Sequence, residues 1–143
     1  IQQFIPSFPY HGISVEQLLS HRSGLPNYLY CFEEKRKQNG PAPTNDTVLA
    51  WFSAANPLPA PYSQPGKNFS YNNTNFIILA SIIEKVSGLS YPEFISSRIF
   101  EPLGMTNSYI DTIAPDTIFM ATKVFFHRSA IWNTGILPCI RDV

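Results

Sequence analysis

One short stretch of the chain places a histidine close to a serine. His21 precedes Ser23 by two residues. A serine and a neighbouring histidine can act in nucleophilic catalysis, because the histidine takes the proton of the attacking hydroxyl. Such a histidine is itself oriented by a third group, and no carboxylate lies at a fixed spacing from His21. We therefore expect His21 to be structural and to shape the loop around it.

A tyrosine and an asparagine precede the most apolar stretch of the chain. These residues, Tyr71 and Asn73, are separated by one position. Taken alone, they have an ordinary explanation. Asparagine is a preferred N-cap, so Asn73 could cap the helix that follows, and Tyr71 could be a half-buried aromatic residue. A catalytic explanation depends on the motifs around them.

The cysteines give no support to a metal site. Cys31 and Cys139 are the only two, and neither belongs to a Cys-x-x-Cys pair of the kind that binds structural zinc. A disulfide between them remains open. We expect neither a metal nor a cofactor.

The composition indicates one folded domain of ordinary size. The chain has 143 residues, and 44% of them are hydrophobic, which is enough for a core. Ten basic and ten acidic residues give a formal net charge of zero. The one charge cluster, residues 33–37, mixes both signs, so a nucleic-acid partner is not expected. No apolar run approaches the roughly 18 residues that span a bilayer, so no transmembrane segment is expected.

Two short helices are predicted from capping boxes, in which a serine and the residue three positions later satisfy each other's backbone amides. These pairs are Ser14 with Gln17 and Ser90 with Glu93. The first helix should end near Ser20. A loop is expected over residues 21–27, because it contains a glycine and a proline. The second helix should end before Pro102.

Two longer helices are expected between these short ones. From Asn45 onward, apolar residues recur at helical spacing; they are Val48, Trp51, Phe52 and Ala55. Another helix is predicted from about Thr74 to Ser87, with Gly88 at its C-terminal cap. Its apolar residues occupy most faces, so it should be central and nearly buried. No stretch has the alternation of a half-buried strand, and the chain is predicted to be mainly helical.

Four motifs in order resemble those of one enzyme family. Leu18–Pro26 reads LLSHRSGLP and resembles the LLSHxSGLP signature of the serine β-lactamase-like family. That family includes class C β-lactamases, D-alanyl-D-alanine carboxypeptidases and related esterases. Pro65–Phe76 reads PGKNFSYNNTNF and resembles the family's PGxxFxYxNTxY stretch. Ile83–Gly88 and Ile99–Met105 complete the pattern.

The resemblance implies a fold and a reaction. The family fold is α+β, with an antiparallel sheet built from both chain ends and a helical subdomain between them, and this chain resembles the helical subdomain. The reaction is acyl transfer through a serine acyl-enzyme. It uses a Ser-x-x-Lys motif, a Tyr-x-Asn motif and a Lys-Thr-Gly or His-x-Gly strand. By this resemblance, Tyr71 is the general base or proton shuttle, and Asn73 holds the lysine and the substrate amide.

The nucleophile motif is not found in this chain. No lysine follows a serine by three positions. An unperturbed phenol has a pKa of about 10, so a tyrosine base needs neighbouring lysines to favour its phenolate. The chain begins at Ile1 without an initiator methionine or signal peptide, which suggests that an upstream segment with Ser-x-x-Lys is missing. We expect the chain to be inactive alone.

The end of the chain does not align with the family. The segments 127–129 and 132–135 resemble the third motif only superficially, since each departs at a defining residue. We therefore divide the chain into residues 1–112, the helical part of a hydrolase domain, and residues 113–143, an unassigned tail.

Two functions of different class follow from these observations. One is a fragment of a serine hydrolase that acts on β-lactams, D-amino-acid peptides or esters and, by family resemblance, is exported to a bacterial periplasm or surface. The other is a non-catalytic ligand-binding module or pseudoenzyme of the same fold. A helical subdomain without its sheet would expose apolar surface, so partial disorder, self-association or poor solubility is also expected.

Overall fold

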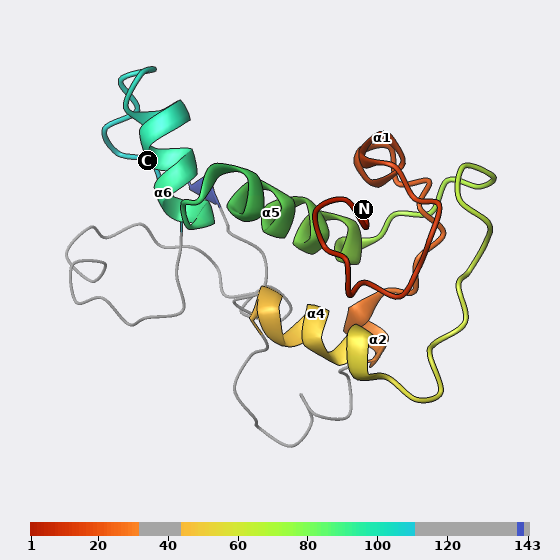
Figure 1. The fold of residues 1–143 in the computed structure, drawn as a ribbon. Helices are drawn as coiled ribbons and strands as arrows, with labels where there is room; N and C mark the ends of the chain where they lie inside the picture. The colour runs from red at the N-terminus through yellow and green to blue at the C-terminus, as the bar shows by residue number, and fades with distance from the viewer. Residues whose placement is uncertain (32–43, 111–139, 142–143) are drawn as a thin grey trace.

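A computed structural model describes residues 1–31, 44–110 and 140–141 of the chain (Figure 1). Nearly all regular structure in these residues is helical, as the sequence predicted. Some of the predictions concern segments outside the described residues. They are the charged cluster at 33–37, the segments at 127–129 and 132–135, and the disulfide partner Cys139.

Helix α5, Asn73–Ser87, is the central element of the fold (Figure 1). It packs against α1, α2, α4 and α6. Ile77 and Ile78 on this helix are almost inaccessible to solvent. The helix ends where Gly88 takes a left-handed conformation with φ 72°, which a residue without a side chain adopts at little cost. The predicted helix and its glycine cap are confirmed, with the start one residue earlier.

The two short helices begin as predicted. Both α1, Val15–Leu19, and α6, Tyr91–Ile95, start with a complete capping box. Helix α6 continues into η1, Ser96–Phe100, a wider turn of π-helix that the sequence did not predict. The chain leaves the helix before Pro102, where the sequence placed its end.

Helix α4, Asn45–Ala54, buries part of the apolar face that its spacing predicted, since Trp51 is only half-buried and Ala55 is the C-cap rather than a residue of the helix. Thr44 is its N-cap, and the Thr44 side chain accepts a hydrogen bond from the amide of Thr47. Val48 and Phe52 are fully buried. A further short helix, α2, Tyr28–Cys31, follows the predicted loop and was not expected from the sequence.

The hydrophobic core lies between the N-terminal segment, the loop at 21–27, and helices α4 and α5. Phe8, Tyr10 and Phe52 form an aromatic cluster whose ring centroids are 5.6 to 5.9 Å apart. Edge-to-face and tilted pairs at such distances are favourable. The buried members of the core are Ile5, Phe8, Tyr10, Ile13, Leu18, Leu25, Tyr28, Val48, Phe52, Ile77, Ile78 and Ile82.

The strands of the described residues are two short ones. Strand β1, Tyr109–Ile110, pairs antiparallel with β2, Ile140–Arg141, so that Tyr109 lies opposite Arg141. No strand was expected from the sequence. Strands of two residues are too short to show the period-two alternation by which a strand is recognised. In the described part of the chain, each helix is also too short or too polar to cross a lipid bilayer.

Candidate active site

Tyr71 and Asn73 lie at the start of α5, on either side of its N-cap, Asn72. Asn72 has an extended backbone, with φ −148° and ψ 118°. Side chains alternate in direction along an extended backbone. The side chains of Tyr71 and Asn73 therefore point away from the side to which the Asn72 side chain points. The exposures agree, since Asn72 is 2% exposed, Tyr71 is 61% exposed and Asn73 is half-buried. The motif thus presents its first and third residues outward and anchors the second.

Asn72 rather than Asn73 caps the helix. The Asn72 side-chain oxygen accepts a hydrogen bond from the amide of Thr74 at 2.9 Å, and its side-chain nitrogen donates to the carbonyl of Leu25. The structural explanation that the sequence allowed for Asn73, helix capping, is therefore wrong. Among the residues that the structure describes, neither the Asn73 carboxamide nor the Tyr71 phenol has a hydrogen-bond partner. Both groups remain available to a ligand or to another part of a catalytic site.

A buried polar network lies beneath the two candidate residues. Asn75, fully buried, donates to the carbonyl of Leu18 at 3.0 Å and accepts from the hydroxyl of Ser23 at 2.6 Å. Thr74, also fully buried, donates to the carbonyl of Pro26 and accepts from the amide of Tyr28, both at 2.9 Å. Buried polar groups are stable only when they are paired in this way. The network therefore fixes the start of α5 against the loop at 21–27.

The network excludes the pairing of His21 with Ser23 as nucleophile and base. Ser23 is 2% exposed, and its hydroxyl donates to Asn75. The Nδ1 atom of His21 accepts from the amide of Asn72 at 3.1 Å. That bond requires an unprotonated Nδ1, so a neutral His21 carries its proton on Nε2. Both side chains hold the backbone in place, as the sequence suggested for His21.

Aromatic rings surround the imidazole of His21 on the exposed side of the network. The ring centroid of Tyr71 lies 4.6 Å from that of His21, with the planes tilted by 36°. Phe76 and Phe69 lie at 5.2 and 5.9 Å. The Tyr71 ring thus packs against His21, while the residue as a whole is 61% exposed.

A close backbone approach holds the segment that leads to Tyr71. Gly24 has φ 72°, and a Cβ atom at this position would overlap the backbone carbonyl oxygen of Ser63. The carbonyl of Gly24 accepts a hydrogen bond from the amide of Tyr62 at 2.8 Å, and the amide of Gly66 donates to the carbonyl of Arg22 at 2.7 Å. Only glycine fits both the conformation and the space. The loop at 21–27 and the segment 62–70 therefore run in direct contact.

A second phenol lies beneath Tyr71. Tyr28 is 1% exposed. Burial, and secondly the neighbouring phenol of Tyr71, raise the pKa of Tyr28 well above its usual range. Tyr28 is consequently protonated at neutral pH. Of these two tyrosines, only Tyr71 is exposed to solvent.

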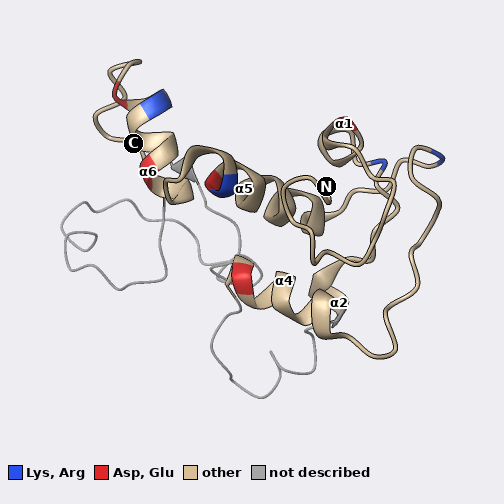
Figure 2. Cartoon of the chain, viewed as in Figure 1, with Lys and Arg blue, Asp and Glu red and all other residues tan. Residues whose placement is uncertain are grey.

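The charged side chains add no second candidate site in the described part of the chain. Acidic and basic residues are scattered over the described helices (Figure 2). The described residues contain no group of three or more His, Cys, Asp and Glu side chains that could hold a metal ion.

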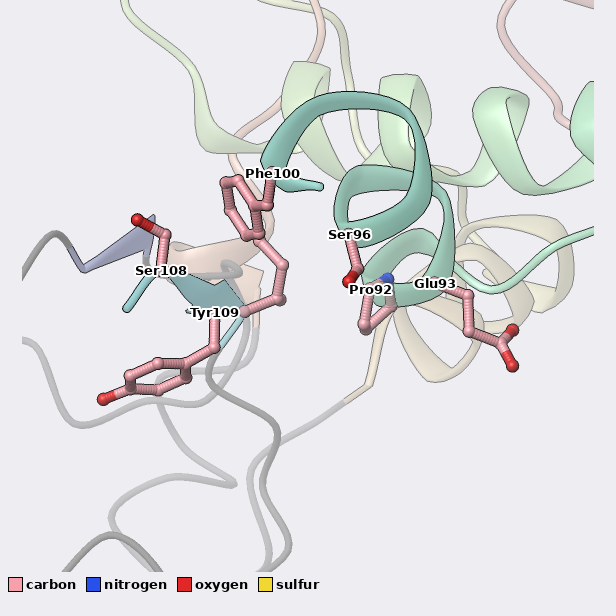
Figure 3. Close-up of a pocket in the computed structure, with 7 residues that line it drawn as sticks. Pro92, Glu93, Ser96, Phe100, Ser108 and Tyr109 are labelled. Carbon is pink, nitrogen blue, oxygen red and sulfur yellow. The ribbon is translucent and has the colours of Figure 1, made fainter. Parts of the chain in front are cut away.

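A cavity of about 290 Å³ lies at the other end of the molecule (Figure 3). Residues of α6, η1 and β1 line it, among them Pro92, Phe100 and Tyr109. The candidate residues Tyr71 and Asn73 take no part in it. Because the Ser96 hydroxyl in this cavity donates to Glu101 and Glu93 bonds to Ser90, its polar groups are already engaged. This cavity therefore adds no further candidate for a catalytic residue.

Sequence reasoning identified the two outward residues and missed the inward ones. Asn72, Thr74 and Asn75 support the site, and their signal was present as a run of four polar residues, 72–75, immediately before an apolar helix. Polar residues at the first turn of a buried helix have to find partners. The partners themselves lie about fifty positions earlier and could not be identified from spacing.

The family model and the related proteins found by comparison agree with one another. The family model described as Beta-lactamase matches residues 1–118. A penicillin-binding protein of Bacillus subtilis is 37% identical over 120 residues, which make up 82% of this chain and 26% of that protein. A D-aminopeptidase of Brucella anthropi is 35% identical over 79 residues, 55% of this chain and 14% of that protein.

The fold comparison agrees with the sequence comparison. The octameric penicillin-binding protein homologue from Pyrococcus abyssi superimposes with a TM-score of 0.64 at 32% sequence identity. The match covers 85% of this chain and 28% of that structure. This chain therefore corresponds to about a quarter of the length of such relatives.

Proposed function

The chain belongs to the beta-lactamase family, and from that premise we propose that Tyr71 and Asn73 form one third of the catalytic machinery of a serine hydrolase. The part present is the helical portion of the family's α+β fold, as the motifs implied. The observation that supports the proposal is the outward position of both side chains. The phenol is exposed and rests on His21, while the residue between the two is buried as an anchor.

The proposed roles follow from the chemistry of the two groups. A phenol placed beside cationic lysines can pass the proton of the attacking serine, because neighbouring positive charge favours the phenolate. A carboxamide both donates and accepts, so Asn73 can hold a lysine ammonium and a substrate amide in one geometry. Both roles need the serine and lysine of Ser-x-x-Lys. We propose that this motif lies N-terminal to the segment and that residues 1–143 alone are inactive.

The proposed substrates are β-lactams, D-amino-acid peptides or small esters, taken up as small molecules or peptides. The names of the relatives, penicillin-binding protein and D-aminopeptidase, support this range. The bacterial origin of these relatives supports export to the periplasm or cell surface. We keep the division into a hydrolase part, residues 1–112, and a tail, residues 113–143. The family model extends to residue 118.

We also propose that the chain self-associates when it is produced without the rest of a hydrolase domain. Several large apolar side chains among the described residues are more than half exposed; they are Leu19, Tyr30, Tyr62, Phe69, Tyr71, Val86 and Leu103. The octameric state named for the Pyrococcus abyssi homologue adds support. Size-exclusion chromatography with light scattering tests it, and a monomeric chain would contradict it.

Covalent labelling tests the enzymatic proposal. The chain should not react with a fluorescent penicillin or a fluorophosphonate, whereas the longer protein with its Ser-x-x-Lys should be labelled at one serine. In that longer protein, Tyr71→Phe should lower the acylation rate by about 10²- to 10⁴-fold, since one proton-transfer group is removed. Tyr30→Phe is the matched control, because Tyr30 is 70% exposed outside the site. A longer protein that is never labelled would support the alternative, a non-catalytic module.

A further inference from the structure

His21 has a backbone conformation that a residue with a side chain seldom adopts. Its φ is 55°, and it is the one non-glycine residue with positive φ among those that the structure describes. A side chain in this left-handed region is unfavourable and persists only where the surroundings enforce it. Such a conformation at the edge of a candidate site calls for a functional explanation.

The conformation lets His21 bind the chain on both sides of Tyr71. The carbonyl of His21 accepts a hydrogen bond from the amide of Ser70 at 2.8 Å. Its Nδ1 atom accepts from the amide of Asn72 at 3.1 Å. Ser70 and Asn72 are the two neighbours of Tyr71 in sequence. One residue, fifty positions earlier in the chain, thus holds the backbone immediately before and after the candidate catalytic tyrosine.

The imidazole also supports the ring of Tyr71. The centroids of the two rings lie 4.6 Å apart, and the ring centroids of Phe76 and Phe69 lie 5.2 and 5.9 Å from that of the imidazole. Tyr71 itself is 61% exposed. Its hydroxyl has no hydrogen-bond partner in the part of the chain that is described. The orientation of the phenol therefore depends on its backbone and on the ring beneath it, and His21 determines both.

We propose that His21 is the positioning residue for Tyr71: its carbonyl and Nδ1 fix the backbone around the tyrosine, and its ring sets the direction of the phenol. Because the Nδ1 atom of His21 accepts from the Asn72 amide, that atom is not free to act as a base, and the proposed role is one of positioning. The inference rests on the proposed function of Tyr71. It assigns to this histidine an effect on the rate of catalysis beyond the stability of the loop.

Two substitutions separate the contributions of the ring and of the acceptor. His21→Phe keeps a ring against Tyr71 but has no acceptor for the Asn72 amide. His21→Asn keeps a side-chain oxygen as acceptor and tolerates positive φ, since asparagine is enriched in that region. Ser90→Ala is the control for general destabilisation, because it removes the N-cap of α6, outside the site.

In the chain itself, His21→Phe should speed hydrogen exchange at the Asn72 amide by about tenfold or more, because that amide loses its acceptor. His21→Asn should restore much of the protection. The ¹⁹F signal of 3-fluorotyrosine at position 71 should shift in both variants and stay unchanged in Ser90→Ala. Unchanged exchange and an unchanged ¹⁹F signal in His21→Phe would overturn the proposal.

In the longer hydrolase, His21→Phe should lower kcat by about 10- to 100-fold with little change in KM, since a misplaced group slows the chemistry more than the binding. His21→Asn should recover part of kcat. If His21→Phe and Ser90→Ala have the same unfolding midpoint and lower kcat equally, the role of His21 is merely structural. That result would overturn the inference. If Tyr71→Phe leaves kcat unchanged, the proposed function fails, while the exchange and ¹⁹F measurements on the chain still decide the role of His21.

Discussion

The two ends of helix α5 are held by different kinds of hydrogen bond. At the N-terminal end, Thr74 and Asn75 bond through buried side chains to residues 46 to 57 positions away. At the C-terminal end, where α5 meets α6, side-chain hydrogen bonds join residues only 2 to 7 positions apart. The candidate catalytic residues lie at the first end. The hydrogen bonds at the N-terminal end can form only when the domain is folded. Those at the C-terminal end can form within one short segment of the chain.

An exposed catalytic group needs the first kind of support. Tyr71 and Asn73 bury too little surface to fix their own positions, so the buried groups behind them must do it. The same substitution should therefore be costly at the N-terminal end of α5 and mild at the C-terminal end.

The largest effect on stability is expected when glycines near the two ends of α5 are replaced. Gly24 lies in the loop that packs against the N-terminal end, and Gly88 caps the C-terminal end. Gly24 and Gly88 have the same φ, 72°. Gly24→Ala should lower the free energy of unfolding by roughly 3 to 5 kcal/mol, because the new Cβ overlaps the Ser63 carbonyl in addition to the conformational strain. Urea denaturation followed by circular dichroism measures this change.

Gly88→Ala is the matched control for Gly24→Ala. In the described part of the chain, no atom apart from those of its sequence neighbours lies within 4 Å of a Cβ built at Gly88, so the left-handed conformation is what opposes the methyl group there. The expected loss is about 1 to 2 kcal/mol. Equal losses for the two variants would contradict the close approach of the loop to the segment at 62–70.

A smaller effect is expected within α5. Asn75→Ala should lower the free energy of unfolding by about 2 to 3 kcal/mol, because the Ser23 hydroxyl and the Leu18 carbonyl lose a buried partner. Ser81→Ala is the comparison, since this buried hydroxyl donates only to Ile77 on the same helix. Its loss should stay below about 1 kcal/mol. A double-mutant cycle of Asn75→Ala with Ser23→Ala should show coupling, and additive losses would exclude the network.

The smallest effect concerns the pH dependence of the capping box on α6. Hydrogen bonds from the Ser90 side chain, and then from the Ser90 amide, lower the pKa of Glu93 below its ordinary 4.5. The carboxylate of Glu93 therefore stabilises the fold above that ordinary value, and this contribution is lost as the pH falls through the lowered pKa. Below it, the protonated side chain no longer favours the folded state.

Thermal unfolding between pH 7 and pH 3 measures the contribution of Glu93. The difference in midpoint between the unmodified chain and Glu93→Gln should shrink as the pH falls. Glutamine serves at the same position in the capping box of α1, where Gln17 pairs with Ser14, so the variant keeps the cap and removes the titration. A difference that stays constant with pH would contradict the assignment.

The contrast between the ends of α5 also explains which parts were predictable from the sequence. The capping boxes at Ser14 and Ser90 and the C-terminal cap at Gly88 depend on neighbouring residues, and all of them were predicted and are confirmed. The outward pair, Tyr71 and Asn73, was identified from motifs that resemble one family. Their catalytic roles remain predictions.

The long-range partners could not be predicted. The bonds of Asn75 to Leu18 and to Ser23 join segments whose contact depends on the fold. The sequence allowed Asn73 as the N-cap, but the backbone places Asn72 there, since residue 72 is the last with extended conformation. Helix α2 and the strands β1 and β2 were missed because elements of two to four residues carry too little periodicity.

The extended N-cap residue of α5, Asn72, limits how this motif can be altered. The Asn72 side chain is buried, and the side chains before and after it face outward. Adding or removing one residue here would turn the buried side chain outward and the phenol inward. The fold should therefore tolerate substitutions at residues 71 and 73 better than substitution of the buried residue between them. The number of residues between positions 71 and 73 therefore restricts sequence changes more than the identity of either outward-facing side chain does.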